Sequence, residues 1–343
     1  MHVPDGFIDA PISAATAVVA AGAIAVSLRG ARRELDEQTA PLAGLVAAFI
    51  FAVQMLNFPV AAGTSGHLLG GALAAILVGP YTGVLCVSVV LLMQGILFAD
   101  GGLTALGVNI TDMAITTTVV AYAVFRGLVK VLPRTRRSIT AASFTAALLS
   151  VPAAALVFTL LYSLGGTTDV SLAKVATAMI GVHLLIGIGE AAITALTVGA
   201  VIAVRPDLVY GARGLEQRLK LRVNGELVDA QAPLAPAAPR TSRRKLWITG
   251  LVASLLLAGF VSFYASSNPD GLEKVAADQG IDQKAKEHAS ADSPLADYGV
   301  RDVDDARLSG GLAGVIGVGV TVVAGTGVFW AVRKRRGTTS QAA

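Results

Sequence analysis

Long uninterrupted runs of apolar residues make up most of this chain, and short polar or basic segments separate them. Most runs have about the 20 residues that an α-helix needs to cross the hydrocarbon core of a bilayer. The runs show no period-two alternation, which excludes a membrane β-barrel. The pattern therefore predicts an all-α polytopic membrane protein. Nine helices are expected, at residues 10–28, 41–58, 67–79, 81–98, 108–125, 139–163, 175–204, 246–265 and 310–332.

The composition agrees with this fold class. Charged residues make up only 15% of the 343 residues, whereas an ordinary soluble domain has about 25%. Because so few charges cannot cover a soluble surface of this size, a soluble enzyme is excluded. The formal net charge of +4 is spread among the loops, which gives no reason to expect a nucleic-acid partner. The single cysteine, Cys86, excludes a disulfide framework and a cysteine zinc site.

The distribution of Lys and Arg predicts how the helices are oriented, because cytoplasmic loops carry an excess of these residues. Of the 27 Lys and Arg, 21 lie in the segments 29–40, 126–138, 205–245 and 333–336. These segments alternate as nine crossings of a cell membrane require. We therefore expect the N-terminus outside and the C-terminus in the cytoplasm. The run 67–79 spans only about 20 Å as a helix, so we expect a short, recessed crossing there.

Three regions are expected along the chain. Residues 1–210 form a seven-helix bundle, residues 211–245 a basic cytoplasmic linker rich in Ala and Pro, and residues 246–343 a two-helix C-terminal unit. The outside loop of this unit, residues 266–309, has ten Asp or Glu and five Lys or Arg. We expect this acidic loop to dock on the outer face of the bundle and to guide cations there, with His288 solvated.

The first candidate site is the start of the chain. The α-amine of Met1, the amide nitrogen of His2 and its imidazole can close fused chelate rings on one metal ion, a set that suits Ni(II) or Cu(II). We expect Met1 to be retained, because its removal normally requires a small second residue. The alternative is that His2 stands at this position by chance and is flexible.

A second candidate lies in the Gly-rich segment 57–71, on the same side of the membrane. His67 is expected to open the short helix of this segment and to supply a fourth nitrogen to the metal. Alternatively, His67 caps that helix or packs at an interface.

Further polar residues on the outer side are candidates for partners that orient the ligating imidazoles, as second-layer groups do in metal sites. Asp100 and Asn109 lie in a third polar, Gly-rich segment, and Asp5 and Ser65 accompany the two candidate ligand segments. Asp100 is equally well explained as the cap of an Asp-Gly-Gly turn. The convergence of three such segments on one membrane face favours a binding site.

Two features of the helices leave other functions open. His183 and Glu190 are seven residues apart on one helix face and are able to relay protons or to form a buried stabilising pair. A secondary transporter or channel for a cation would use them. Ala17, Ala21 and Ala25 form a small-residue stripe suited to close helix contact. The chain has no P-loop, H-E-x-x-H or G-x-S-x-G motif, so we expect no enzyme activity.

Three motifs together resemble those of the CbiM/NikM family, the substrate-specific membrane components of energy-coupling factor importers for cobalt or nickel. They are Met-His-Val-Pro-Asp-Gly at residues 1–6, Gly-Thr-Ser-Gly-His at 63–67, and Asp-Gly-Gly-Leu-Thr-Ala-Leu-Gly-Val-Asn at 100–109. Asn-Pro-Asp-Gly-Leu-Glu at 268–273 resembles a fused PDGLE (CbiN/NikN-like) unit. Pro4-Asp5 and Gly66-His67-Leu68 are closer to the nickel-like branch.

The resemblance implies the function and the metal ligands. Co(II) or Ni(II) would be the transported substrate, held by the free amine of Met1, the amide and imidazole of His2, and His67, with no cofactor. A coupling transmembrane protein and two ATPase domains would be the partners, and ATP hydrolysis would drive toppling of the bundle. The alanine stripe would meet the coupling protein.

Overall fold

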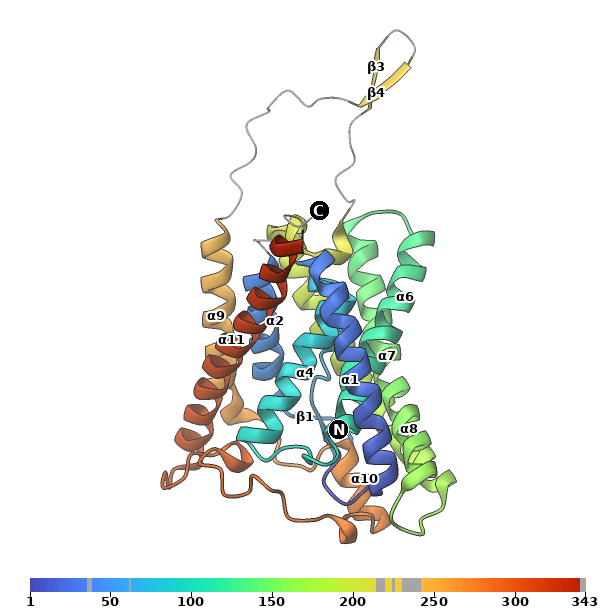
Figure 1. Cartoon of the computed structure of the whole chain (residues 1–343), viewed down its shortest axis with the longest axis vertical. Coiled ribbons are helices and arrows are strands. Elements are labelled where there is room, and N and C mark those ends of the chain that lie inside the picture. The colour runs from blue at the N-terminus through green and yellow to red at the C-terminus, as the bar shows by residue number, and fades with distance from the viewer. Residues whose placement is uncertain (36–38, 62, 214–219, 224–225, 230–241, 340–343) are drawn as a thin grey trace.

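A computed structural model describes residues 1–35, 39–61, 63–213, 220–223, 226–229 and 242–339. Long helices lie side by side along the vertical axis of Figure 1, and the N-terminus and α10 (Gly271–Gln279) lie towards the lower end. Seven helices of the described residues are long and apolar enough to cross a membrane. The predicted all-α multi-pass membrane fold is confirmed. Most of the linker predicted at 211–245 lies outside the described residues.

The N-terminal bundle has the seven predicted helical segments, five of which reach membrane-spanning length. Between α5 and α6 the helix continues as the π-helix Ile110–Thr116. The helices are α1 (Ala10–Glu34), α2 (Thr39–Gln54), α3 (Gly71–Val78), α4 (Pro80–Leu97), α5 (Leu106–Asn109) continued by α6 (Thr117–Val131), α7 (Arg136–Gly165) and α8 (Leu172–Val204).

Helix α3 is shorter than predicted and every residue in it is buried. The prediction that His67 opens this helix is wrong, because the helix begins at Gly71. Gly70 has φ +90°, a left-handed conformation that glycine adopts without the steric cost of a side chain. The antiparallel pair β1 (Phe58–Pro59) and β2 (Ser65–Gly66) precedes it. Residues 67–70 are therefore buried, non-helical backbone.

Side chains from two neighbouring helices satisfy this buried backbone. The Glu190 carboxylate of α8 accepts hydrogen bonds from Leu69 N at 2.5 Å and Gly70 N at 3.0 Å. The Gln54 amide of α2 donates to Leu69 O at 3.0 Å. Irregular backbone survives at membrane depth only where protein groups replace the missing hydrogen bonds. Glu190 thus holds the segment that carries His67.

The C-terminal unit packs on α2 rather than standing apart. Its helices are α9 (Arg243–Gly259), followed by the 3₁₀ turn Val261–Tyr264, and α11 (Ala306–Thr339). At Gly44 the backbones of α2 and α11 approach so closely that a Cβ atom would lie 2.8 Å from Thr326 N. Such contact at small residues is how membrane helices associate. A second hairpin, β3 (Lys220–Val223) with β4 (Glu226–Asp229), lies between the two units in sequence.

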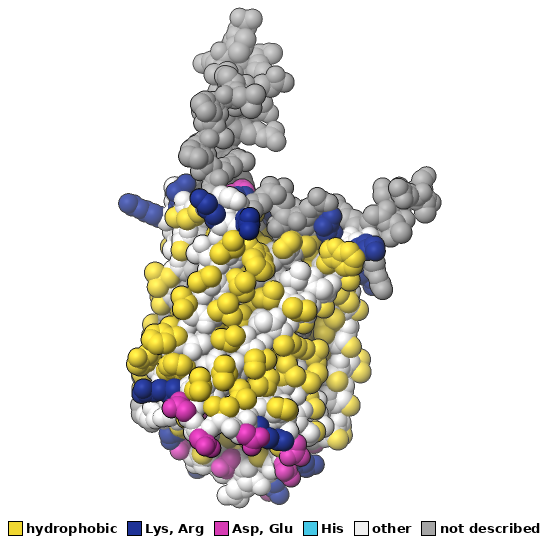
Figure 2. Space-filling model, turned by 90° about the vertical axis from the view of Figure 1, so that its left-hand side faces the viewer, with side chains coloured by type: hydrophobic (Ala, Val, Ile, Leu, Met, Phe, Trp, Pro, Cys, Tyr) yellow, Lys and Arg dark blue, Asp and Glu magenta, His cyan; other side chains and the backbone are white. Residues whose placement is uncertain are grey.

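The charged side chains gather at the two ends of the long axis. Figure 2 shows Lys and Arg at the upper end, a broad apolar band in the middle, and Asp and Glu together with some Lys and Arg at the lower end. The acidic end holds the start of the chain and the segments on which the candidate ligands were predicted.

We predict that Glu190→Ala lowers the thermal stability of the purified protein. The change leaves two buried N–H groups without acceptors, at about 1–3 kcal/mol each, so the unfolding midpoint in detergent should fall by several degrees. The control is Asp169→Ala, which removes an exposed carboxylate. Equal midpoints for the Glu190 variant and the wild type would contradict this role.

Candidate metal centre

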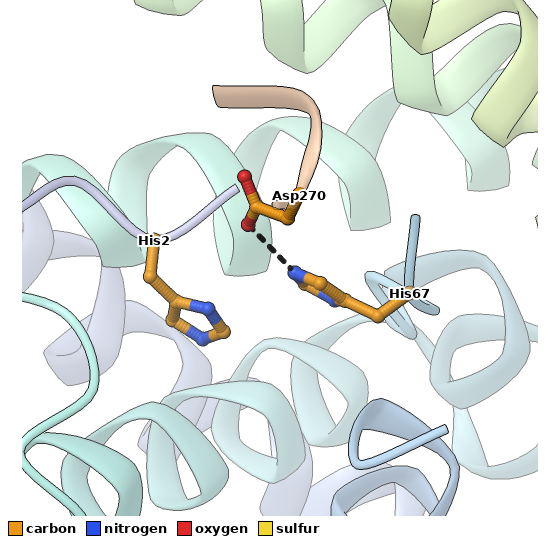
Figure 3. A group of neighbouring side chains, drawn as sticks. All are labelled: His2, His67 and Asp270. Carbon is orange, nitrogen blue, oxygen red and sulfur yellow. Dashed lines mark ion pairs between the residues drawn. The ribbon is translucent and has the colours of Figure 1, made fainter. Parts of the chain in front are cut away.

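Three chain segments meet at the acidic end: residues 1–6, the connection between α2 and α3, and the connection between α4 and α5. The C-terminal unit adds a fourth. Figure 3 shows His2, His67 and Asp270 with their side chains converging on one space. Each of these residues offers a ligand atom, and the three atoms lie within 4.8 Å of one another. Met1, His2, His67 and Asp270 are all buried.

The bundle fixes the backbone of the first residues. Asn109 accepts a hydrogen bond from Val3 N at 2.7 Å through Oδ1 and donates from Nδ2 to Val3 O at 3.1 Å. Asp5 accepts from Thr104 N at 2.8 Å and from the Thr104 hydroxyl. Asn109 and Asp5 thus hold the backbone beside His2, whereas the sequence had suggested contacts with the imidazoles themselves.

The chain terminus points directly at His67. The Met1 nitrogen lies 2.7 Å from His67 Nε2. On the other side of the ring, Nδ1 is 2.9 Å from Leu68 O, and because a carbonyl only accepts, Nδ1 carries the proton. Nε2 therefore turns its lone pair towards the amine, the tautomer in which Nε2 is a metal ligand.

The His2 imidazole is neutral and is also fixed in orientation. Burial lowers the pKa of His2 to about 4. His2 Nε2 is 3.1 Å from Gln94 Oε1, an acceptor, so Nε2 carries the proton. His2 Nδ1 then has a free lone pair, 3.3 Å from Asp100 Oδ1. Two electron-rich atoms that face each other across this distance mark a favourable place for a cation.

Tyr298 of the C-terminal unit connects the two groups that flank His2. Its hydroxyl donates to Asp100 Oδ2 at 2.6 Å and accepts from Gln94 Nε2 at 2.9 Å. Burial and the nearby Asp100 carboxylate raise the pKa of Tyr298 well above its ordinary value, so the hydroxyl stays protonated and donates. Sequence reasoning identified Asp100 as a partner of the site but missed Gln94 and Tyr298.

Asp270 is the second residue that the C-terminal unit brings to the site. Its Oδ2 lies 2.6 Å from the Met1 nitrogen and 3.5 Å from His67 Nε2. Burial by itself would raise the pKa of Asp270, but the Met1 ammonium and His67 hold it well below its usual value. The carboxylate is therefore ionised. Sequence reasoning used the Pro-Asp-Gly-Leu-Glu motif for a resemblance and did not count Asp270 as a site residue.

The acidic loop docks on the bundle, as predicted. Ser65, a predicted partner of the imidazoles, instead fixes this loop, because its hydroxyl donates to Asn268 O at 2.8 Å. Lys286 N donates to Asp5 O at 2.8 Å. His288 was expected to be solvated, but its Nε2 lies 3.2 Å from Gly101 O, so this expectation is wrong.

The docked loop leaves an opening beside the ligands. A polar cavity of about 640 Å³ is lined by residues that include His2, His67, Asp100 and Asp270. Carboxylates and the nitrogens of the two histidines thus line the same cavity. The donor set, neutral nitrogens with one carboxylate oxygen, suits a divalent transition metal.

The remaining predicted residues lie away from this cluster or serve it indirectly. His183 Nδ1 is 2.8 Å from Met179 O and its Nε2 has no hydrogen-bond partner among the described residues. Since Glu190 bonds to Leu69 and Gly70, the predicted His183–Glu190 pair does not form. The alanines at 17, 21 and 25 are all exposed on α1.

Comparison with known proteins identifies the family of this chain. The family described as "Cobalt uptake substrate-specific transmembrane region" (CbiM) matches residues 2–208, and the PDGLE domain matches residues 244–334. The fused nickel transport protein NikMN of Rhodobacter capsulatus is 31% identical over 270 residues, which cover 79% of this chain and 63% of that protein. The cobalt transport protein CbiM of Geobacter sulfurreducens is 33% identical over 293 residues, which cover 82% and 79%.

A solved structure extends the likeness to the fold. The crystal structure of a truncated transition metal transporter superposes with a TM-score of 0.53 at 27% identity, over 59% of this chain and 99% of that one. The family match spans more than half of the chain and includes every predicted nitrogen ligand side chain. The chain belongs to the CbiM family of metal transport proteins, with a PDGLE domain joined to its C-terminal side.

Proposed function

We propose that this protein is the substrate-binding membrane subunit of an ATP-driven energy-coupling factor importer for cobalt or nickel. The metal is held by the Met1 amine, the amide nitrogen and Nδ1 of His2, and Nε2 of His67. The observation that carries the proposal is the buried chain terminus, whose nitrogen lies 2.7 Å from His67 Nε2. A chain end is rarely ordered unless contacts hold it, and here these contacts are metal-binding groups.

The chemistry of the site supports a transition metal over a hard cation. Calcium and magnesium prefer oxygen ligands, whereas the amine and the two imidazoles supply nitrogen. Intrinsic affinity for nitrogen sites rises from Co(II) to Ni(II). The names of the two relatives, one for nickel and one for cobalt, match this range.

The energy for uptake comes from partner subunits in this proposal. The exposed stripe of Ala17, Ala21 and Ala25 on α1 gives a coupling transmembrane protein a smooth face to pack against, and separate ATPase subunits hydrolyse ATP. The acidic end with the site faces outwards and the basic end faces the cytoplasm, as the positive-inside rule requires. The acidic loop raises the local concentration of cations there.

The alternative, a secondary cation transporter built on His183 and Glu190, has less support. A proton relay needs its groups in contact or linked by water, and these two residues bond to different backbone segments. Uptake into vesicles without the ATPase subunits, driven by a proton gradient, would favour this alternative.

We predict that a few residues added before Met1 abolish metal binding. The extension converts the amine into an amide nitrogen and places chain in a buried site. Protein with its native N-terminus should bind about one ion per chain when cobalt and nickel are offered in competition, measured by metal content after desalting. His67→Ala should cause a similar loss, because it removes another ligand of the same ion.

A matched control adds the same residues at the C-terminus of the chain, which follows α11. The C-terminal extension should leave binding unchanged. An N-terminally extended protein that binds the metal as tightly as the native form would refute the proposed ligand set.

We predict that Tyr298→Phe weakens metal binding by about tenfold while the fold remains intact. The hydroxyl orients both Gln94 and Asp100 beside His2, and loss of such supporting partners typically costs 10- to 100-fold in metal affinity. Isothermal titration with nickel measures the effect. Tyr264→Phe, on an exposed tyrosine of the same unit, is the control, and equal affinities for both variants would contradict the role of Tyr298.

A further inference from the structure

We propose that Asp270 of the PDGLE domain is itself a ligand of the transported metal, so that the ion joins the two units of the chain. This inference rests on the proposed function, because it adds an oxygen to the nitrogen set at the same site. It assigns the C-terminal unit a direct part in binding, beyond covering the bundle.

The first support is distance. Asp270 Oδ2, the Met1 nitrogen and His67 Nε2 form a triangle with sides of 2.6, 2.7 and 3.5 Å. Two ligand atoms that each lie about 2.1 Å from one metal, at a right angle, are about 3.0 Å apart. The three atoms are therefore spaced as neighbouring ligands of one ion. A ring nitrogen of His2 lies within 4.8 Å of the ligand atoms of His67 and Asp270.

The second support is the fixed orientation of the carboxylate. Asp270 Oδ1 accepts hydrogen bonds from Leu272 N at 2.7 Å and Glu273 N at 2.9 Å at the start of α10. The Glu273 side chain returns a bond to Asp270 N at 2.8 Å, which completes a capping box. One oxygen is thus used to begin the helix, and the other is directed into the site.

Packing around the turn prevents the carboxylate from moving away. A Cβ atom on Gly271 would come within 3.0 Å of His183 Cε1 and 2.8 Å of Ile186 Cδ1, so this glycine lies against α8. On the other side, Ser65 N donates to Pro269 O at 2.9 Å. The turn is held from both sides, and Oδ2 keeps its place when the ion enters.

Charge balance gives the third support. A metal bound at the Met1 amine replaces one ammonium proton, which passes to solvent, so the amine no longer carries its own positive charge. A buried carboxylate that loses its charged partner is strongly unfavourable, whereas coordination to the incoming cation restores the balance. The carboxylate would add a fifth ligand to the four proposed nitrogens. This oxygen changes the preferred geometry and so contributes to the choice between metals.

In a competing interpretation, Asp270 is a lock: it only pairs with the Met1 ammonium and holds it protonated until the metal binds. The two interpretations predict opposite changes in metal affinity when Asp270 is removed. If Asp270 is a ligand, its removal weakens metal binding, whereas removal of a lock strengthens it. Asp270→Asn is the suitable variant, because asparagine caps helices as well as aspartate does and keeps the turn, while its amide is a poor metal ligand.

The experiment uses the full chain with its native N-terminus in detergent and nickel(II) as the probe. Asp270→Asn should bind nickel at least about tenfold more weakly than the wild type in a competition titration. X-ray absorption at the nickel edge supplies the second measurement. A square-planar four-nitrogen ion gives a resolved pre-edge feature that a fifth ligand removes, so this feature should be absent in the wild type and present in Asp270→Asn.

The control is Asp278→Asn, the same substitution at an exposed position of α10, which should match the wild type in affinity and spectrum. Equal or tighter binding by Asp270→Asn would overturn the assignment. Weaker binding with an unchanged spectrum would also overturn it, because the carboxylate would then act through its charge alone. Failure of the wild type to bind nickel or cobalt would instead refute the proposed function.

Discussion

The contact between the chain terminus and His67 is the constraint on which the rest of this structure depends. A buried ammonium is unfavourable unless it is paired, and here His67 and Asp270 lie 2.7 and 2.6 Å from the Met1 nitrogen. To bring these groups together, the fold has to bury a free chain end and an irregular backbone segment. Asn109 stabilises the buried chain end by hydrogen bonds to both backbone polar groups of Val3. Glu190 stabilises the irregular backbone segment.

The short helix α3 follows from the same constraint. A full-length helix would pass the site with its backbone groups bonded internally and would leave no segment free to present His67 Nε2. The chain instead stays non-helical through residue 70, where Gly70 is left-handed, and begins its helix at Gly71. Glu190 and Gln54 replace the missing hydrogen bonds. A full-length crossing is thus replaced by a short helix and a buried loop, and such a loop is stable at membrane depth only where protein groups supply its hydrogen-bond partners.

Local chemistry explains which parts were predictable from the sequence. Continuous apolar runs predict the helices. The ligand groups of Met1, His2 and His67 can be recognised from the residue type or from the position at the chain terminus. The predicted start of α3 was wrong because the left-handed turn at Gly70 depends on contacts with other helices, which the local sequence does not show. Asp270, Gln94 and Tyr298 were missed because their roles arise only when the acidic loop docks. One signal was available for Asp270: Asp-Gly-Leu-Glu has the spacing of a capping box, which fixes one carboxylate oxygen and leaves the other free.

Helix packing places the C-terminal unit over the site. Helix α9 begins at the basic end, opposite the metal centre. The close approach of α2 and α11 at Gly44, where a Cβ would meet Thr326, fixes the height and rotation of α11. Since the loop 266–309 is tied to α9 and α11 at its ends, that helix contact sets where Tyr298 and Asp270 lie. A larger side chain at Gly44 would therefore displace Tyr298 and Asp270 at the metal centre, although Gly44 lies in a different part of the bundle.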